Sequence, residues 1–86
     1  MFKAVLGNKV FTVTWVHDVE HRRTMCFIES PNGQIYTGFA RVHPEDKYVK
    51  AIGRKVSLAK ALQNFTSNKN IRKFFWDEYK KRCKLN

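Results

Sequence analysis

Carboxylates, cysteines and long apolar runs are all scarce in this sequence of 86 residues. Seven Asp and Glu accompany seventeen Lys and Arg, which leaves a formal net charge of +10. Such an excess repels itself in a compact chain, and nucleic acid is the partner that most often explains it. No apolar run approaches the roughly 20 residues of a bilayer span, and the N-terminal FKAVL is too short for a signal-peptide core. We therefore expect no membrane partner and a cytoplasmic location.

The two cysteines, Cys26 and Cys83, are too few and too far apart for the disulfide framework of a small secreted domain. We expect both to be free and reduced. His17, His21 and His43 join Cys26 as residue types that bind zinc, but zinc ligands usually come in close pairs on a turn or a helix. Here the first two histidines flank a loop between strands. We therefore expect no metal and no cofactor.

Residues in recognisable catalytic arrangements are missing as well. The carboxylates are scattered, with Asp18 and Glu20 in a predicted loop and Glu29 at a hairpin, and no carboxylate pair or Gly-rich phosphate loop is present. A dyad of Cys26 with a histidine stays open from sequence alone, because such partners meet only in the fold. A thiol inside a strand is more commonly buried and inert. We expect no enzymatic activity.

The first half of the chain shows the alternation that is typical of strands. FKAVL (2–6) and KVFTVTWV (9–16) flank Gly7-Asn8, a dipeptide that suits a tight hairpin. RTMCFIE (23–29) and QIYTGFARV (34–42) flank SPNG (30–33), in which Gly33 supplies the left-handed residue of a bulged hairpin. In the second strand, large apolar residues alternate with threonines, which predicts one buried face and one polar face free for contact.

The second half is predicted to be helical. Pro44 suits the first position of a helix over about 44–65, and Glu45 and Asp46 then lie at the positive end of its dipole. A turn of 100° per residue places one apolar arc toward the core: Tyr48, Val49, Ile52, Val56, Ala59 and Leu62. The opposite arc carries Lys47, Lys50, Arg54 and Ser57. After FTSNKN, a second helix is predicted over about 70–84 with Ile71, Phe75, Tyr79 and Arg82 on one face.

These elements predict one α+β domain over residues 1–86. Its fold class is a three- or four-stranded antiparallel β-meander followed by two α-helices packed on one face. An edge strand of such a sheet can pair with its twin, so we expect a monomer or a homodimer.

The basic residues are the leading candidates for function, because Lys and Arg three and four residues apart on a helix can contact successive phosphates. The residues predicted to contact nucleic acid are Lys47, Lys50, Arg54, Arg22, Arg23, Lys73, Lys80 and Lys84. Arg41, Lys69 and Arg72 add to the excess of positive charge. A solvated helix face carries the same residue types, so this pattern leaves both interpretations open.

Trp76 lies toward the edge of the apolar arc of the second predicted helix. A partly exposed indole beside Lys73 and Lys80 suits a stacking contact with a base or a hot spot for a protein partner. The alternative to nucleic-acid binding is therefore an inhibitor that binds a host protein through Trp76, Lys73 and Lys80. Electrostatic steering toward an acidic patch would use the same bases.

The segment TGFARVHPEDKYVKAIGRKVSLAKAL resembles one found in small bacteriophage and prophage proteins of unassigned function. The shared positions are Gly38, Ala40, Pro44, Asp46, Lys50, Gly53, Arg54, Lys55, Leu58, Ala59, Ala61 and Leu62. The resemblance implies a phage origin, a location in a bacterial host cell and, for the alternative, a host polymerase or defence nuclease as target. Three antiparallel strands and a helix also look like the DNA-binding domains that lay a sheet in the major groove.

Overall fold

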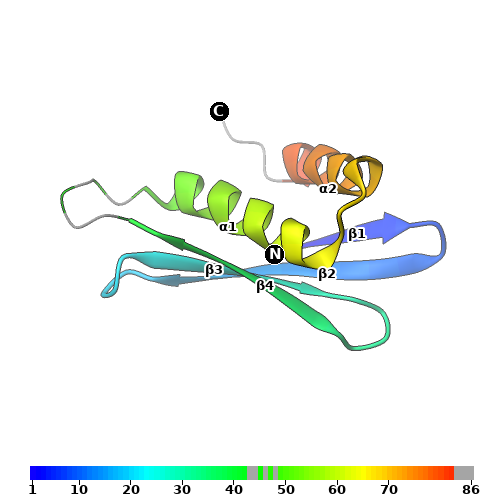
Figure 1. The fold of residues 1–86 in the computed structure, drawn as a ribbon, viewed down its shortest axis with the longest axis horizontal. Helices are drawn as coiled ribbons and strands as arrows, with labels where there is room; N and C mark the ends of the chain where they lie inside the picture. Colours follow the sequence, from blue (N-terminus) through cyan, green and yellow to red (C-terminus); the bar gives the residue numbers. More distant parts are fainter. Residues whose placement is uncertain (43–44, 46, 48, 83–86) are drawn as a thin grey trace.

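Four strands form one antiparallel sheet in the order β1-β2-β3-β4, and two helices cover one of its faces (Figure 1). The computed structural model describes residues 1–42, 45, 47 and 49–82. The elements are β1 (Phe2–Leu6), β2 (Lys9–Asp18), β3 (Arg23–Glu29), β4 (Ile35–Arg41), α1 (Lys50–Phe65) and α2 (Lys69–Arg82). The predicted α+β fold is confirmed, with four strands. No helix within the described ranges combines the length and apolar character that a bilayer crossing requires.

The turns explain why the strands fall where the sequence predicts them. Gly7 has φ +65° in the two-residue connection between β1 and β2, where Leu6 pairs with Lys9. Gly33 has φ +89° between β3 and β4, and its N–H donates to the Ser30 carbonyl at 3.0 Å. Both hairpins are confirmed, because glycine occupies this region of φ without steric cost.

The start of the first helix was predicted wrongly. α1 begins at Lys50, after an extended Val49 that provides no side-chain cap, and Glu45 lies outside the helix. No carboxylate therefore occupies the first turn of α1. Positions 44, 46 and 48 lie outside the described residues. For α2, the side chain of Asn68 accepts hydrogen bonds from the backbone N–H groups of Asn70 (2.9 Å) and Ile71 (3.3 Å), which is an N-cap.

The buried face of α1 also differs from the predicted arc. Ile52 and Val56 are 59% and 39% exposed, whereas Ser57 is fully buried. The reason is a seam of small residues, spaced four apart, by which α1 approaches the sheet: Gly53, Ser57 and Ala61. A Cβ added to Gly38 of β4 would lie 2.2 Å from the Ser57 carbonyl oxygen, so the helix backbone rests directly on the strand.

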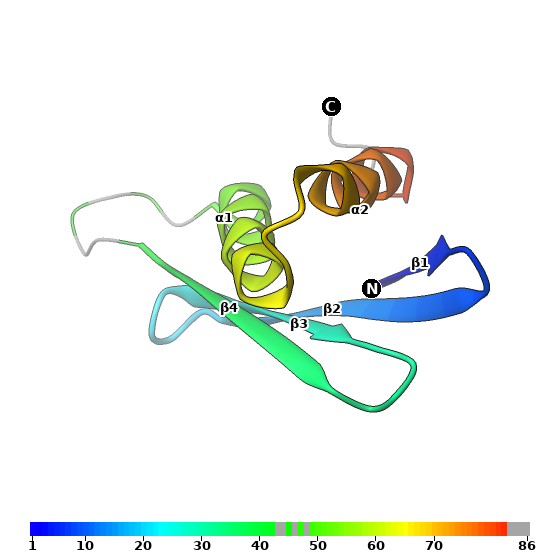
Figure 2. The same ribbon diagram turned by 45° about the vertical axis from the view of Figure 1, so that its right-hand side comes forward.

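Aromatic rings close the core beneath α2. Phe11 of β2 contacts Phe65 and Phe75 with ring centroids 5.4 and 5.5 Å apart, and both contacts are edge-to-face. Leu58 and Leu62 of α1 are fully buried in the same cluster. Among the described residues, no helix lies on the opposite side of the sheet (Figure 2). The sheet therefore separates a helix layer from an open sheet face.

Candidate nucleic-acid interface

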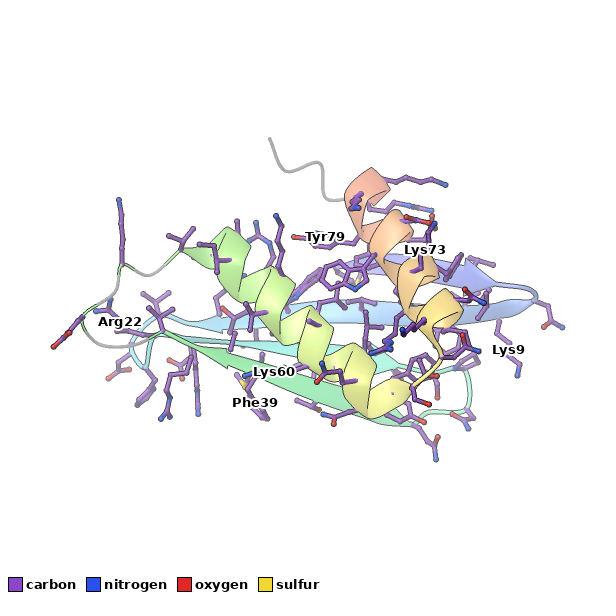
Figure 3. The ribbon with its side chains drawn as sticks, turned by 45° about the horizontal axis from the view of Figure 1, so that its top comes forward. Lys9, Arg22, Phe39, Lys60, Lys73 and Tyr79 are labelled. Carbon is purple, nitrogen blue, oxygen red and sulfur yellow. The ribbon has the colours of Figure 1, made fainter. Side chains whose placement is uncertain are left out.

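Five basic residues from four parts of the chain lie at one end of the molecule, which we call the basic end: Arg22, Arg23, Arg41, Lys50 and Arg54. Alternation along β3 and β4 puts Arg23 and Arg41 on the side of the sheet that faces away from the helices. Arg23 of β3 pairs with Arg41 of β4 in the sheet register. The carbonyl of Arg22 in the preceding turn accepts a 2.9 Å hydrogen bond from the N–H of Val42, at the end of β4. Lys50 and Arg54 arrive from the first turns of α1. Figure 3 shows Arg22 at this end.

The pKa of His17 responds to the positive charges at the basic end. Its Nδ1 lies 3.1 Å from Oγ1 of Thr24, beneath the start of α1. Desolvation and then the positive charges of Arg54 and Lys50 lower the pKa of His17 below its ordinary value. Burial, together with the two cations of α1, thus holds the imidazole toward its neutral form. Nε1 of Trp15 in β2 also donates a hydrogen bond to the Arg54 carbonyl at 3.2 Å, so the start of α1 lies close to β2.

Asp18 is one carboxylate that lies at the basic end. Its Oδ2 accepts a hydrogen bond from Nε of Arg23 at 3.1 Å, and Nδ1 of His21 lies 2.9 Å from the same oxygen. Desolvation raises the pKa of Asp18, but the hydrogen bonds from His21 and Arg23 outweigh it, and the net pKa is lowered. Asp18 therefore offsets part of the positive charge of Arg23. It forms no such pair with Lys50 or Arg54 among the ion pairs of the described residues.

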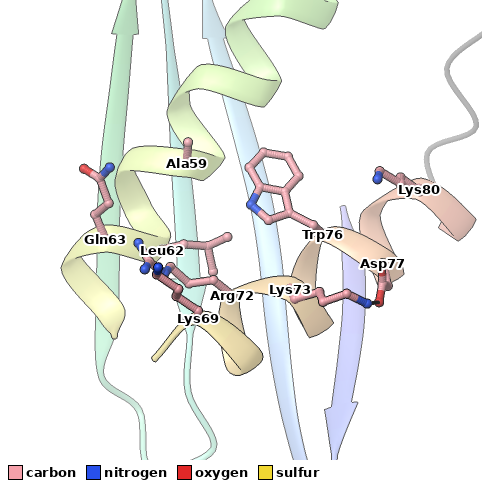
Figure 4. A pocket seen from close by; sticks show the side chains of 9 residues that line it. All are labelled: Ala59, Leu62, Gln63, Lys69, Arg72, Lys73, Trp76, Asp77 and Lys80. Atoms are coloured by element: carbon pink, nitrogen blue, oxygen red, sulfur yellow. Dashed lines mark hydrogen bonds and ion pairs between the residues drawn. The ribbon is translucent and has the colours of Figure 1, made fainter. Parts of the chain in front are cut away.

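A second basic region lies between the two helices. An open groove of about 600 Å³ runs between α1 and α2 (Figure 4). We call it the interhelical groove; its charged lining residues are Lys69, Arg72, Lys73, Lys80 and Asp77. Asp77 pairs with Lys73 at 3.2 Å, and Nη2 of Arg72 donates to the Ser67 carbonyl at 3.4 Å. Four cations thus share one carboxylate in the lining that the structure describes.

Trp76 lines the interhelical groove beside these cations. It is partly buried, packs against the core and meets the ring of Tyr79 edge-on at 5.6 Å. Figure 4 shows its indole between α1 and α2. The core holds one side of the ring while the groove gives access to it. The predicted position of Trp76 at the edge of the apolar face is confirmed.

The structure divides the predicted binding residues into these two regions instead of one stripe. Arg22, Arg23, Lys50 and Arg54 lie at the basic end, with Arg23 on the opposite side of the sheet from the helices, and Lys73 and Lys80 line the groove together with Trp76. Lys47 is exposed but precedes α1, so it is not part of a helix face. Residue 84 lies outside the described residues.

Three groove or end residues were counted in the sequence but given no place: Arg41, Lys69 and Arg72. Strand register would have placed Arg41 next to Arg23, since their strands are joined by a recognisable turn. Nothing in the sequence indicated that Lys69 and Arg72 open toward α1, because that depends on how the two helices pack.

The candidate catalytic and metal-binding residues do not converge. Cys26 is fully buried, and desolvation raises the pKa of its thiol to about 12, which keeps it protonated at neutral pH. His17 contacts Thr24 while His21 contacts Asp18. Within residues 1–42, 45, 47 and 49–82, no three His, Cys, Asp or Glu side chains gather as a metal site would require.

A hollow of about 360 Å³ at the opposite end of the sheet, beside the turn between β3 and β4, is different in character. Its one charged lining residue within the described chain is Lys9.

No protein-family model matches this chain, and neither a curated protein nor a solved structure is similar to it. The basic end and the interhelical groove are therefore the features of this structure that bear on function.

Proposed function

We propose that this protein is a non-enzymatic binding protein that holds the phosphate backbone of nucleic acid against its helix layer. The observation that supports this most directly is the interhelical groove, in which four cations and an accessible indole share one carboxylate. Phosphate contacts from Lys and Arg supply affinity without requiring sequence readout. We expect weak sequence preference, and in a phage setting the ligand would be phage or host nucleic acid.

The alternative of an ordinary solvated surface fits the groove less well than it fits the C-terminal turn of α2 outside the groove. There, Glu78 lies 3.4 Å from Lys81 and 3.9 Å from Arg82, so that cations are offset within the helix. The groove lining repeats no such balance, because Asp77 is its single described carboxylate. Concentrating like charge in a concave site is costly unless a polyanion neutralises it.

Fluorescence anisotropy with labelled single- and double-stranded oligonucleotides of about 30 nucleotides tests the proposal. We expect binding that persists near 0.15 M salt, where a screening length of about 8 Å removes weak surface attraction. The double variant Lys69→Gln/Arg72→Gln should bind at least about 10-fold more weakly, and its salt slope should fall by about one unit per lost phosphate contact.

The matched control is Lys3→Gln/Lys9→Gln, which removes the same charge from exposed strand positions away from the groove. Its affinity should change by less than the affinity of the groove variant. Equal losses in the two variants would mean that net charge alone drives binding, and the groove would have no special role. Absence of binding near 0.15 M salt in the parent protein would reject the proposal.

A host protein is the second candidate ligand, because Trp76 beside Lys73 and Lys80 also has the residue types of a protein hot spot. On this hypothesis the protein is an inhibitor, and the charges orient an acidic partner such as a polymerase or defence nuclease. Tagged protein should then capture one host protein from nuclease-treated lysate, and Trp76→Ala should abolish capture. Capture that disappears on nuclease treatment would favour nucleic acid instead.

A further inference from the structure

The open sheet face carries rows of side chains that the strand register defines. One row joins Val16, Met25 and Phe39, and the next joins Thr14, Phe27 and Thr37. Phe39 is 51% exposed, while its strand neighbours Gly38 and Ala40 are buried under α1 (Figure 3). Val5, Val10 and Ile35 lie on the same face toward the other end of the strands and are 51%, 44% and 59% exposed.

The charges of this face are few and nearly balanced. Alternation along the strands places three cations here, Lys3, Arg23 and Arg41, together with two carboxylates, Asp18 and Glu29. One net positive charge out of a formal total of +10 thus belongs to the open sheet face. Phosphate has little to attract it, whereas a contiguous apolar surface of this kind indicates a protein interface.

We propose that the open sheet face binds the same face of a second copy of this chain, so that two sheets stack in a symmetric dimer. The residues Trp15, Cys26 and Gly38 share one row across β2, β3 and β4. A two-fold axis along that row stacks the sheets with their strands antiparallel. Because Arg23 and Glu29 are each three residues from Cys26, Arg23 then lies opposite Glu29 of the second copy.

The charge pattern also selects this axis over its alternative. A two-fold axis parallel to β3 would bring Arg23 against Arg23 of the second copy and leave both Glu29 side chains without a cation. The transverse axis makes the Arg23–Glu29 pair twice and places Met25 over Phe27 of the second copy. Arg23 bonds Asp18 through Nε, and a guanidinium has four further N–H groups for a second carboxylate.

The high net charge does not prevent this association. Stacked sheets are about 10 Å apart, and each helix layer lies about as far again on the outer side, so the two basic layers are separated by about 30 Å. That distance exceeds several screening lengths of about 8 Å at 0.15 M salt. The dimer therefore keeps both helix layers outside, and the inference does not depend on what those layers bind.

The dimensions of the sheet indicate a weak dimer. Four strands spaced about 4.8 Å apart, with about seven residues rising about 3.3 Å each, span roughly 440 Å² per copy. Standard interfaces bury about 800 Å² per partner. We expect a dissociation constant in the micromolar range, so the experiment must cover protein concentrations from about 1 to 300 μM.

Sedimentation equilibrium over that range, at 0.15 M salt and without nucleic acid, tests the inference. The parent protein should pass from monomer to dimer with rising concentration, and Phe39→Asp should raise the dissociation constant at least 10-fold. The control is Ile52→Asp, which replaces an apolar residue of similar exposure on the helix layer and should leave dimerisation unchanged. Circular dichroism confirms that each variant is folded.

Charge reversal tests the orientation. Glu29→Arg and Arg23→Glu should each weaken self-association, because like charges then oppose one another across the axis. An equimolar mixture of the two variants should recover dimers, since each variant complements the other. Met25→Asp provides a second interface variant if Arg23→Glu, beside Asp18, fails to fold.

Three results would overturn the inference. The parent protein could be monomeric throughout the range. Ile52→Asp could disrupt the dimer as much as Phe39→Asp does. Phe39→Asp could leave association intact and weaken oligonucleotide binding instead, which would assign the open sheet face to unpaired bases. These results leave the groove proposal untouched, because that proposal is tested by variants of Lys69 and Arg72.

Discussion

The helix layer and the open sheet face of this protein are built on the same four strands but differ in charge. The helix layer holds the interhelical groove, with four cations to one carboxylate in its described lining. The open sheet face has apolar rows and nearly balanced charge. Composition alone gives +10 for the chain and suggests a uniformly basic protein. The comparison shows that the charge is distributed unevenly: the cations of the groove come from α2, whereas alternation along the strands gives the open sheet face nearly equal numbers of cations and carboxylates.

The close contact between α1 and the sheet fixes the position of the helix layer relative to the strands. Gly38 and Gly53 let backbone and side chains approach more closely than any larger residue permits. Trp15 adds a fixed point, because its Nε1 donates to the Arg54 carbonyl at 3.2 Å. The position of Arg54 at the basic end therefore depends on packing at the centre of the fold.

A substitution at the contact between α1 and β4 should have the largest effect, because it separates the helix layer from the sheet. In Gly38→Val the new side chain begins at a Cβ that lies 2.2 Å from the Ser57 carbonyl oxygen and 2.3 Å from the Ala61 nitrogen. Both are backbone atoms, so α1 must move away from β4. We expect a loss of about 3 kcal/mol or more in the free energy of unfolding, measured by urea denaturation.

Gly53→Ala is the matched control for that substitution. Its added Cβ would meet Oγ1 of Thr24 at 2.4 Å and Cβ of Thr24 at 3.1 Å, which are side-chain and not backbone atoms, and alanine favours the helix by about 1 kcal/mol. We expect a smaller loss than for Gly38→Val. A larger loss would mean that Thr24, and not β4, sets the position of the helix.

The buried side of α1 can be tested against the arc that its apolar residues predict. Leu58→Ala should cost about 3 kcal/mol, because the leucine is fully buried, whereas Ile52→Ala should cost less than about 0.5 kcal/mol. Thermal and urea unfolding provide the measurement. If Ile52→Ala cost more than Leu58→Ala, Ile52 would belong to the buried side of α1, as the apolar arc predicts.

The strands were predictable from sequence because alternation and turn glycines agree. Residues 2–6 and 23–29 are strands with the predicted bounds. The face of α1 was not predictable from apolar periodicity, because its closest contact is made by Gly53, Ser57 and Ala61. Small residues carry little weight in an apolar pattern, yet they determine how closely a helix approaches a sheet.

The candidate site was only partly predictable for a similar reason. The sequence allowed cations to be counted, and Trp76 could be placed at the edge of the apolar face. Which cations gather depends on strand register and helix packing. The basic end joins Arg41 to Lys50 across a segment that includes positions 43, 44, 46 and 48, outside the described residues.

The two tryptophans should report the difference between groove and core. Trp76 lines the groove, whereas Trp15 lies between the sheet and α1. In Trp15→Phe, oligonucleotide should quench the remaining emission of Trp76; in Trp76→Phe, the emission of Trp15 should stay unchanged. If a base stacks on Trp76, Trp76→Ala should lose about 1–3 kcal/mol of binding free energy. Quenching of Trp15 alone would place the ligand elsewhere.

His17 provides the smallest and most local effect, since it reports the field of the basic end without contributing a cation to it at neutral pH. Its pKa lies below 6.5, so the unfolded chain binds a proton at pH values where the folded chain has released it. Its contribution to stability is therefore present above pH 6.5 and is lost as the pH falls from 6.5 through the lower pKa of the folded state.

NMR titration of the His17 imidazole should show a higher pKa in Lys50→Gln/Arg54→Gln, because two of the three causes of the shift are removed. Oligonucleotide bound at the basic end should raise the pKa in the same direction, since phosphates neutralise those cations. Lys3→Gln on the open sheet face is the control and should leave the pKa of His17 unchanged. A pKa that oligonucleotide does not move would confine nucleic acid to the interhelical groove and divide the helix layer into a binding part and a merely charged part.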